Sequence, residues 1–445
     1  MFTSLSLENF KSWRSIPEMR LAPITGLFGA NSSGKSSILQ FFLLLKQTVE
    51  ATDRATVLEF GNDKTPVNLG SFKDVVFGHD CKHLSFSIAW KSKRLSKFVL
   101  EDSLKKPIDK FDFSCEIVEK DSGIAVERFT YRLDADTFTM QKTSPHGNDY
   151  YLSCEAKDFP VSNTKKPVPA PIKFFGFPKQ VYAYYQAADS LSYLQLDFEN
   201  LFEGIHYLGP LRDFPQRQYL WSGSRPTDIG FRGELAIHAI IASKEKNGGG
   251  SNGSSQLEYE IARWLQEWGL IRSFSVEPLN KDSNIYEVRV KKTANSTPVL
   301  LTDVGFGVSQ VLPVLTLCYH VPEGSVIILE QPEIHLHPSV QAGLADLFIE
   351  VAYRRNLQII FESHSEHLLR RLQRRIAEEQ FRNVFYLPEN IALYFCKFQD
   401  TESQLEKLQV NELGDIENWP DDFFGDEIGE MNAMLQAAMK QEKAP

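Results

Sequence analysis

The chain has 445 residues, of which 42% are hydrophobic and 24% charged, and its formal net charge is −10. This length and composition predict two or three domains with a substantial core, and they exclude a chain that is disordered throughout. The acidic balance argues against a surface that coats nucleic acid by charge alone, whereas a local basic groove stays compatible with it.

Cysteines and apolar runs indicate the cellular compartment. The five cysteines are scattered and form no CxxC pair, which favours a reducing cytosol over a disulfide framework or a zinc site. Met1–Arg20 mixes charge and polarity and lacks the apolar block of a signal peptide. The apolar run ILQFFLLL is far shorter than the roughly 18–20 residues of a membrane span. We therefore expect a soluble, cytoplasmic protein without membrane contact.

In chain order, the hydrophobic pattern predicts alternating strands and helices. Residues 1–28 favour strand, turn and strand, and helical spacing follows over 38–50. Short alternating runs broken by Gly, Pro, Asp and Asn over 58–198 predict an antiparallel meander. Buried strands are expected at VIILE (326–330) and LQIIFESHS (357–365). Further helices are expected over 190–202, 233–245, 257–268, 338–355 and 366–379, and a flexible loop over 247–255.

The stretch GANSSGKS (Gly29–Ser36, the phosphate loop) fits G-x-x-x-x-G-K-[ST] in full and lies between an apolar strand and a helix. Its glycines let backbone N–H groups point at a phosphate, and the helix N-terminus adds a favourable dipole. Lys35 would neutralise the outer phosphates, and the Ser36 hydroxyl would bind Mg²⁺. A mere Gly/Ser-rich turn is the alternative, but residue types, spacing and context favour nucleotide binding. The candidate residues are Gly29, Asn31, Ser33, Gly34, Lys35, Ser36 and Ser37.

A second glycine-containing stretch, TDVGFGVSQ (302–310), opens a helical run beginning VLPVL. Gly305 and Gly307 allow close approach of the backbone, and Ser309 and Gln310 are short polar donors. Alone, the stretch is equally typical of an ordinary helix start. Its place shortly before the strand at 326–330 favours nucleotide contact by Gly305, Gly307 and Ser309.

Two buried strands end in groups suited to phosphate chemistry. Val326–Leu329 ends in Glu330, as a strand with a magnesium-binding carboxylate would. IIFESHSEHLL places His364 just past another strand, within reach of a terminal phosphate. A lone histidine there is usually structural, but this constellation favours a functional role.

These pieces, in this order and with the opening LSLENFKSW, resemble an ABC-type AAA family ATPase head of the RecF/SMC/OLD-like group. The sequence segments VGFGVSQVLP, EQPEIHLHP, SHSEHLL and DDFF are similar to those of a subgroup of bacterial predicted ATPases. Members of this subgroup are often encoded beside defence or nuclease partners. YLGPLR, which contains Arg212, also occurs in that subgroup. The resemblance covers most of the chain at the level of motif order.

The resemblance implies an α/β, two-lobed head with a mixed or parallel core sheet, an antiparallel β subdomain and a helical lobe. Lobe I would comprise residues 1–90 and 323–445, with a β-rich region (91–185) packed on it, and lobe II residues 186–322. Two heads would sandwich two ATP molecules with Mg²⁺, each site taking the phosphate loop from one chain and Gly305–Gln310 from the other. We therefore expect a homodimer or a higher oligomer.

Several features depart from the group's pattern. Neither coiled-coil arms nor a TOPRIM nuclease domain is expected, because no heptad run is sustained and the tail lacks a metal-site pattern. The second glycine-containing stretch differs from the L-S-G-G-Q signature of the group. Which of its residues contacts the γ-phosphate therefore stays open. The Q-loop position is assigned only to the segment Leu69–Phe77, and Lys11–Trp13 is either an adenine contact or a surface turn.

Gln331 occupies the slot of the usual catalytic glutamate, and Glu330 that of the usual aspartate. An amide cannot act as a general base, although it can orient water. Glu330, Gln331 and His364 are the catalytic candidates. Glu330, Glu333 or His364 could take the proton, and Glu330 is favoured because it ends the strand nearest the metal. This arrangement predicts slow hydrolysis and a long-lived ATP-bound dimer.

Two basic stretches could contact nucleic acid. Lys91–Lys97 and the helix with Arg370, Arg371, Arg374 and Arg375 would bind phosphates without reading sequence. The alternative is a solvated turn and a solvated helix face.

The function expected from these features is an ATP-driven dimeric switch. It would control a partner effector, a nuclease or toxin, in anti-phage defence or DNA maintenance. The alternatives are a non-hydrolysing ATP-dependent scaffold and a DNA repair ATPase that binds DNA directly. A self-sufficient nuclease is disfavoured because clustered metal ligands are absent from the sequence.

Overall fold

The computed structural model of the protein places most of the chain. The described residues are 1–92, 110–120, 123–133, 136–144, 147, 149–155, 166–184, 188–246, 255–280, 283–378, 380–381, 384–385, 388–420, 423–425, 429, 431 and 433–434. Two predicted features, the basic residues 93–97 and the loop at 247–254, lie outside the described residues.

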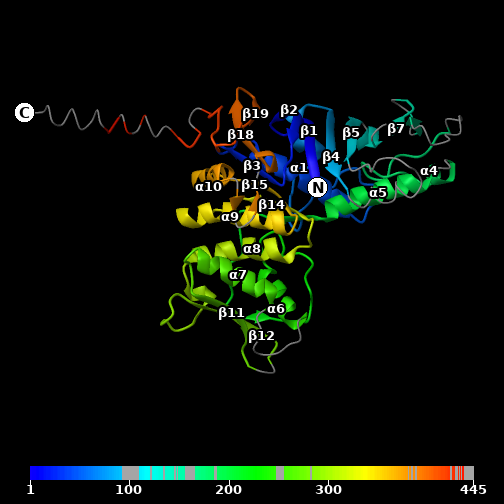
Figure 1. The fold of residues 1–445 in the computed structure, drawn as a ribbon. Helices are drawn as coiled ribbons and strands as arrows, with labels where there is room; N and C mark the ends of the chain where they lie inside the picture. The colour runs from blue at the N-terminus through cyan, green and yellow to red at the C-terminus, as the bar shows by residue number, and fades with distance from the viewer. Residues whose placement is uncertain are drawn as a thin grey trace, which may run out of the picture.

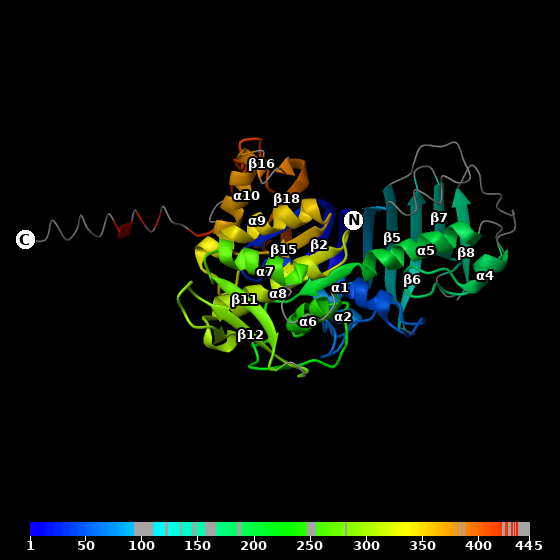
Figure 2. The same ribbon diagram turned by 60° about the horizontal axis from the view of Figure 1, so that its bottom comes forward.

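A seven-stranded antiparallel sheet forms one layer of the fold (Figure 2). The alternating runs predicted as a meander supply five of its strands, because alternation buries one face of each strand. The first two strands of the chain extend the same sheet, so the predicted boundary at residue 90 lies inside it. In order across the sheet, the strands are β2 (Trp13–Arg20), β1 (Phe2–Phe10), β4 (His83–Lys91), β5 (Lys110–Lys120), β6 (Gly123–Leu133), β7 (Asp136–Lys142) and β8 (Tyr150–Glu155).

A six-stranded sheet forms the second layer. Its strands, in order, are β19 (Glu402–Lys407), β18 (Ile391–Gln399), β3 (Ile24–Gly29), β15 (Gln358–Glu362), β14 (Val326–Glu330) and β9 (Ile205–Leu208). All neighbours are parallel except β18 and β19. Every residue of β3, β14 and β15 is buried. A parallel sheet is covered on both faces, which explains these continuous apolar runs.

Helices cover both faces of the six-stranded sheet. α1 (Lys35–Glu50) packs between the two sheets, and the ring of its Phe41 lies 5.2 Å from that of Phe10. α8 (Phe306–His320) and α9 (Pro338–Arg354) lie on the opposite face, and α10 (Glu366–Ala377) packs on α9. Within β14, Ile328 belongs to the core around α1, whereas Ile327 and Leu329 belong to the core around α8 and α9.

A second lobe lies beside this sheet, at the bottom of Figure 1. It combines α8 with two further helices and a small antiparallel sheet whose central strand is β12. Its other elements are α6 (Ala236–Lys246), α7 (Gln256–Glu267), β10 (Tyr219–Leu220), β11 (Ser273–Pro278), β12 (Ile285–Lys291) and β13 (Val299–Leu300).

The remaining elements are mostly short. α5 (Ala188–Glu203) runs along the antiparallel sheet, where Phe198 lies 4.7 Å from Phe113 between ring centroids (Figure 2). The others are α2 (Phe72–Val75), α4 (Lys179–Tyr184), β16 (Gln380–Phe381), β17 (Val384–Phe385) and the 3₁₀ turns η1 (Phe77–His79), η2 (Leu301–Asp303) and η3 (Pro388–Asn390).

The predicted fold class is confirmed. The protein is α/β and two-lobed, with a mixed core sheet, an antiparallel β subdomain and a helical lobe. None of the helices that the structure describes is both long and apolar enough to cross a bilayer.

Candidate functional site

The phosphate loop joins the carboxyl end of β3 to the start of α1, as its motif predicts. Gly29 and Gly34 have positive φ angles of 134° and 96°. A Cβ at Gly29 would lie 2.1 Å from the Cys396 carbonyl oxygen, and one at Gly34 would lie 2.5 Å from the Ser403 hydroxyl. Backbone conformation and space therefore both require glycine at these positions.

Replacing Gly29 with alanine is expected to lower the free energy of unfolding by about 2–4 kcal/mol, because the new Cβ would overlap a backbone oxygen at a strained φ. Gly307→Ala is the matched control, since its Cβ would lie 3.5 Å from the nearest atom, within a helix that favours alanine. Urea unfolding of both variants measures the difference. Equal unfolding free energies would contradict the prediction.

The polar side chains of the loop are partly buried. Lys35 Nζ donates to the carbonyl oxygens of Gly29, at 3.1 Å, and Ala30, at 2.8 Å. Burial lowers the pKa of Lys35, and the nearby Glu362 carboxylate opposes that shift. The Ser33 hydroxyl is buried without a hydrogen-bond partner. Asn31 is exposed, and Ser36 and Ser37 are half-buried.

Ser36 contacts a carboxylate that the sequence patterns did not single out. The Ser36 hydroxyl donates to Glu362 at 2.6 Å between Oγ and Oε2. Glu362 ends β15, the strand next to β3. Burial raises the pKa of Glu362, and the Ser36 hydrogen bond opposes that shift. The acid that contacts Ser36 is therefore Glu362, whereas Glu330, the predicted magnesium-side carboxylate, ends the next strand along.

Glu330 lies beside Glu362, because β14 and β15 pair these two residues in register and paired side chains point to the same face. Glu330 is 7% exposed and accepts a hydrogen bond from the Tyr207 hydroxyl at 2.9 Å. Burial, followed by the charge of Glu362, raises the pKa of Glu330 to about 7. A carboxyl that titrates near neutrality is suited to accept a proton at physiological pH.

Gln331 begins the turn after β14 and has a φ of 45°, which is unusual for a residue with a side chain. Its N–H donates to the Glu362 carbonyl at 3.1 Å. Its carbonyl accepts from the Ile334 N–H and from Arg212 Nη2, each at 3.2 Å. These bonds fix the backbone at the slot where the resemblance expects a glutamate.

His364 and Glu333 meet beside the phosphate loop. The His364 N–H donates to Glu333 Oε1 at 2.7 Å. Burial, and then the charge of Lys35, lower the pKa of His364. Glu333 is 7% exposed, burial raises its pKa, and its Oε2 has no hydrogen-bond partner. The structure thus brings His364, Glu333 and Lys35 into one cluster.

The second glycine loop begins α8, with Gly305 as its N-cap. The Ser309 hydroxyl donates to the Phe306 carbonyl at 2.8 Å, and Ser309 is buried. A Cβ at Gly305 would meet no atom within 4 Å. Among the described residues, no hydrogen bond or ion pair joins this loop to the phosphate loop.

An apolar surface borders the second glycine loop. Leu211, Phe214 and Phe306 are 75%, 76% and 42% exposed. The rings of Phe214 and Phe306 lie 5.8 Å apart, and Phe306 lies 5.1 Å from His335. Phe214 and Phe306 thus form an exposed apolar cluster at the start of α8.

The turn Lys11–Trp13 joins β1 to β2 and packs against the phosphate loop. Trp13 is fully buried, and its Nε1 donates to the Gly34 carbonyl at 3.1 Å. Ser12 is bonded to Ser403 by a backbone contact of 2.7 Å and a hydroxyl contact of 2.7 Å. The Lys11 N–H donates to Val75, within the predicted Q-loop segment, at 2.7 Å. This turn is therefore part of the wall around the loop, and adenine contact remains a prediction.

The four arginines of α10 each contact a carboxylate of the same helix, of its C-cap residue or of the neighbouring α9. Arg370 and Arg374 keep 55% and 60% of their side chains exposed, so their ion pairs are weak. Nucleic-acid contact by this helix remains a prediction. The pairs are Arg370 with Glu366, Arg371 with Asp346, Arg374 with Glu378, and Arg375 with Asp346 and Glu378.

Residues 24–370 match a family described as "AAA domain, putative AbiEii toxin, Type IV TA system". The chain belongs to this AAA family. Residues 387–434 also match a family described as "Protein of unknown function (DUF3696)". No curated protein matches the sequence.

Solved structures similar to this AAA chain include heads of SMC proteins. The SMC head domain from Thermotoga maritima is 12% identical, with a TM-score of 0.43 over 92% of this chain and 99% of that chain. An SMC head bound to the C-winged helix domain of ScpA is 13% identical, with a TM-score of 0.46 over 92% and 98%. A head with an extended coiled coil, bound to the C-terminal domain of ScpA derived from Pyrococcus furiosus, is 9% identical, with a TM-score of 0.41 over 98% and 99%.

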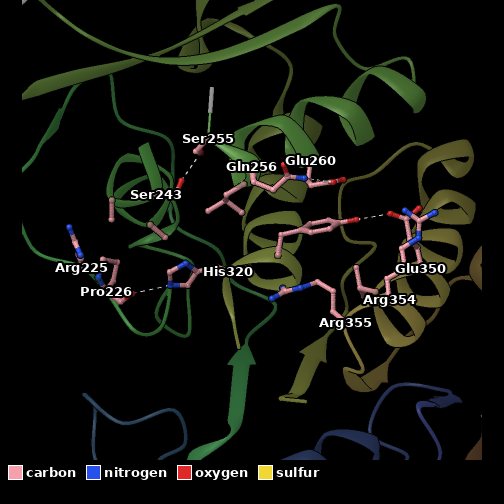
Figure 3. A pocket seen from close by; sticks show the side chains of 15 residues that line it. Arg225, Pro226, Ser243, Ser255, Gln256, Glu260, His320, Glu350, Arg354 and Arg355 are labelled. Atoms are coloured by element: carbon pink, nitrogen blue, oxygen red, sulfur yellow. Dashed lines mark hydrogen bonds between the residues drawn. The ribbon is translucent and has the colours of Figure 1, made fainter. Parts of the chain in front are cut away.

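The AAA chain also contains a pocket of about 530 Å³ in its second lobe, between α6, α7, α8 and α9 (Figure 3). His320 lies in its wall and bonds to the Pro226 carbonyl at 2.9 Å, and Arg355 donates to carbonyl oxygens at the end of α8. Its lining includes no residue of the phosphate loop and none of the acids described above. This pocket is therefore separate from the candidate nucleotide site.

Proposed function

We propose that this chain binds ATP with Mg²⁺ and hydrolyses it slowly, and that its nucleotide-bound form controls a partner effector. One observation carries the proposal: the phosphate loop faces two adjacent buried carboxylates, with Ser36 bonded to Glu362 and Glu330 next to it. Membership of the AAA family supports the same activity.

The residues present fit a magnesium nucleotide. Mg²⁺ usually takes one or two carboxylates together with substrate phosphates and does not need an all-protein cage. Ser36 and Glu362 would hold the metal, with Glu330 at its side. Lys35, the Ser33 hydroxyl and the backbone N–H groups of the loop would bind phosphates, which would satisfy the buried Ser33 hydroxyl. The bound metal supplies neutralisation of phosphate charge.

The residues on the other side of the phosphates would act on water. Glu330 accepts the proton, because its carboxyl titrates near neutrality. The Gln331 side chain orients the water by hydrogen bonds and takes no proton. His364, neutral at pH 7, donates a hydrogen bond to the terminal phosphate. Because the proton acceptor is Glu330 and not a glutamate in the usual slot, hydrolysis is slow. The ATP-bound form of the chain is therefore long-lived.

A second copy of the chain would complete the site. The second glycine loop makes no described bond to the phosphate loop of its own chain, and the exposed Leu211, Phe214 and Phe306 border it. Burying that surface against the partner would bring Gly305, Gly307 and Ser309 over the nucleotide held by the other copy. The family description names a putative toxin of a toxin–antitoxin system, which supports a role within such a system. Gln331 favours, as the second candidate, a scaffold that binds ATP without turnover.

Lys35→Ala tests nucleotide binding directly. Because Lys35 is the buried cation of the phosphate loop, its removal is expected to weaken ATP binding at least tenfold. Equilibrium dialysis with labelled ATP, and phosphate release under the same conditions, measure binding and turnover separately. Lys46→Ala, a half-buried lysine later in α1 that pairs with Glu50, is the control. Binding and assembly without phosphate release would favour the scaffold, and unchanged ATP binding by Lys35→Ala would contradict the proposal.

A further inference from the structure

A buried arginine lies between the two lobes, in the loop that follows β9. Arg212 is 7% exposed. Its Nη1 donates to the Gln310 carbonyl in α8 at 2.7 Å, and its Nη2 donates to the Gln331 carbonyl at 3.2 Å. Its charge also acts on Glu333, the residue that holds the His364 N–H. A single guanidinium therefore links α8, the turn after β14 and the acid beside His364.

Arg212 and two residues that it interacts with each carry a buried polar atom without a hydrogen-bond partner. Arg212 Nε, Gln310 Nε2 and Glu333 Oε2 are all buried without a hydrogen-bond partner. Two of these atoms are donors and one is an acceptor, so small movements of α8 against the turn could pair them. Leaving a buried polar atom unpaired costs roughly 1–3 kcal/mol.

We propose that Arg212 is a positioning residue that couples the second lobe to the hydrolytic groups. Arg212 holds the turn that contains Gln331 and Glu333 to the start of α8. Gln331 and Glu333 therefore reach the positions needed for hydrolysis only when the second glycine loop is in place over the nucleotide. This inference rests on the proposed function, because hydrolysis is the step that the positioning serves.

The guanidinium of Arg212 suits this positioning role better than another cationic side chain would. Two carbonyl oxygens on different elements are bridged by the planar fork of a guanidinium, whereas a lysine offers one ammonium on a flexible stem. Gln331 holds a strained φ of 45°, and the Arg212 bond to its carbonyl helps to stabilise that conformation. Leu211 and Phe214, exposed on the same loop, connect this link to the surface proposed for a second copy.

Arg212→Lys and Arg212→Met, compared with wild type, test the inference. The dissociation constant for a fluorescent ATP analogue is expected to stay within about twofold. The value of kcat is expected to fall about tenfold in Arg212→Lys and about 100-fold in Arg212→Met, because orientation of the reacting groups is lost. Arg225→Met, which changes an exposed arginine in the segment between β10 and α6, is the control and should match wild type.

A second comparison separates positioning from folding. Arg212→Met leaves Glu333 without its buried cation, which is expected to destabilise the fold. Arg212→Met with Glu333→Gln should regain thermal stability, while its kcat per nucleotide-bound chain stays well below that of Glu333→Gln alone. The inference is overturned if kcat per bound chain equals that of wild type in Arg212→Lys, or recovers together with stability in the double variant. A wild-type chain that binds no ATP analogue would instead overturn the proposed function itself.

Discussion

Glu330→Gln is expected to lower kcat for ATP hydrolysis by about 100- to 10,000-fold, the range contributed by a general base. The amide keeps the size of the side chain and can still accept the Tyr207 hydrogen bond, so the fold and ATP affinity should change little. Phosphate release under saturating ATP and Mg²⁺ measures kcat, and labelled-ATP binding measures affinity.

The pH profile identifies the group. Because burial and Glu362 raise the pKa of Glu330 to about 7, the carboxyl is protonated below that pH and cannot take a proton. In the wild type, kcat/KM should therefore rise with pH through a midpoint near 7, and this limb should be absent from Glu330→Gln. Gln331→Glu would add a base at the usual slot and should raise kcat. Full activity of Glu330→Gln, or unchanged turnover of Gln331→Glu, would exclude these roles.

Glu362→Gln is expected to reduce the response to Mg²⁺. The Ser36–Glu362 contact of 2.6 Å joins the hydroxyl of the phosphate loop to an acid that ends the neighbouring strand. Replacing the acid with an amide removes one charged oxygen ligand for a hard cation. We expect the Mg²⁺ concentration for half-maximal activity to rise at least tenfold and kcat to fall about 100-fold at a fixed concentration.

A Mg²⁺ titration of ATPase activity measures both effects. Glu366→Gln, four residues further along and paired with Arg370 at the start of α10, is the matched control and should leave the titration unchanged. If Glu362→Gln and the control gave the same curve, Glu330 alone would be the magnesium-side carboxylate.

Local motifs could be predicted from the sequence, whereas contacts between distant segments could not. The phosphate loop, Glu330, Gln331 and His364 lie at strand ends because apolar runs and glycines specify those positions locally. Glu362 had the same signal as Glu330, an acid ending a buried strand, and parallel strands end at one edge of a sheet. That pattern in LQIIFES could have identified it.

Tyr207 and Arg212 both lie in YLGPLR, a segment that supports the resemblance, but nothing in that segment predicted which residues they contact. Tyr207 reaches Glu330 across 123 positions of sequence, and Arg212 reaches Gln331 across 119. Only the strand order, with β9 next to β14, places them at the site. β1 and β2, which were expected in lobe I, pair within the antiparallel sheet, while the turn between them contacts the phosphate loop.

The bond between Ser12 and Ser403 has a consequence for how the protein is made. These residues are 391 positions apart, and both lie against Gly34, where a Cβ would touch each hydroxyl. The ribosome therefore synthesises the phosphate loop early but supplies the last part of its wall only when the β18–β19 hairpin emerges. Contacts this far apart in sequence form late and slowly. The nascent chain is thus expected to acquire its nucleotide site only after the β18–β19 hairpin has emerged from the ribosome.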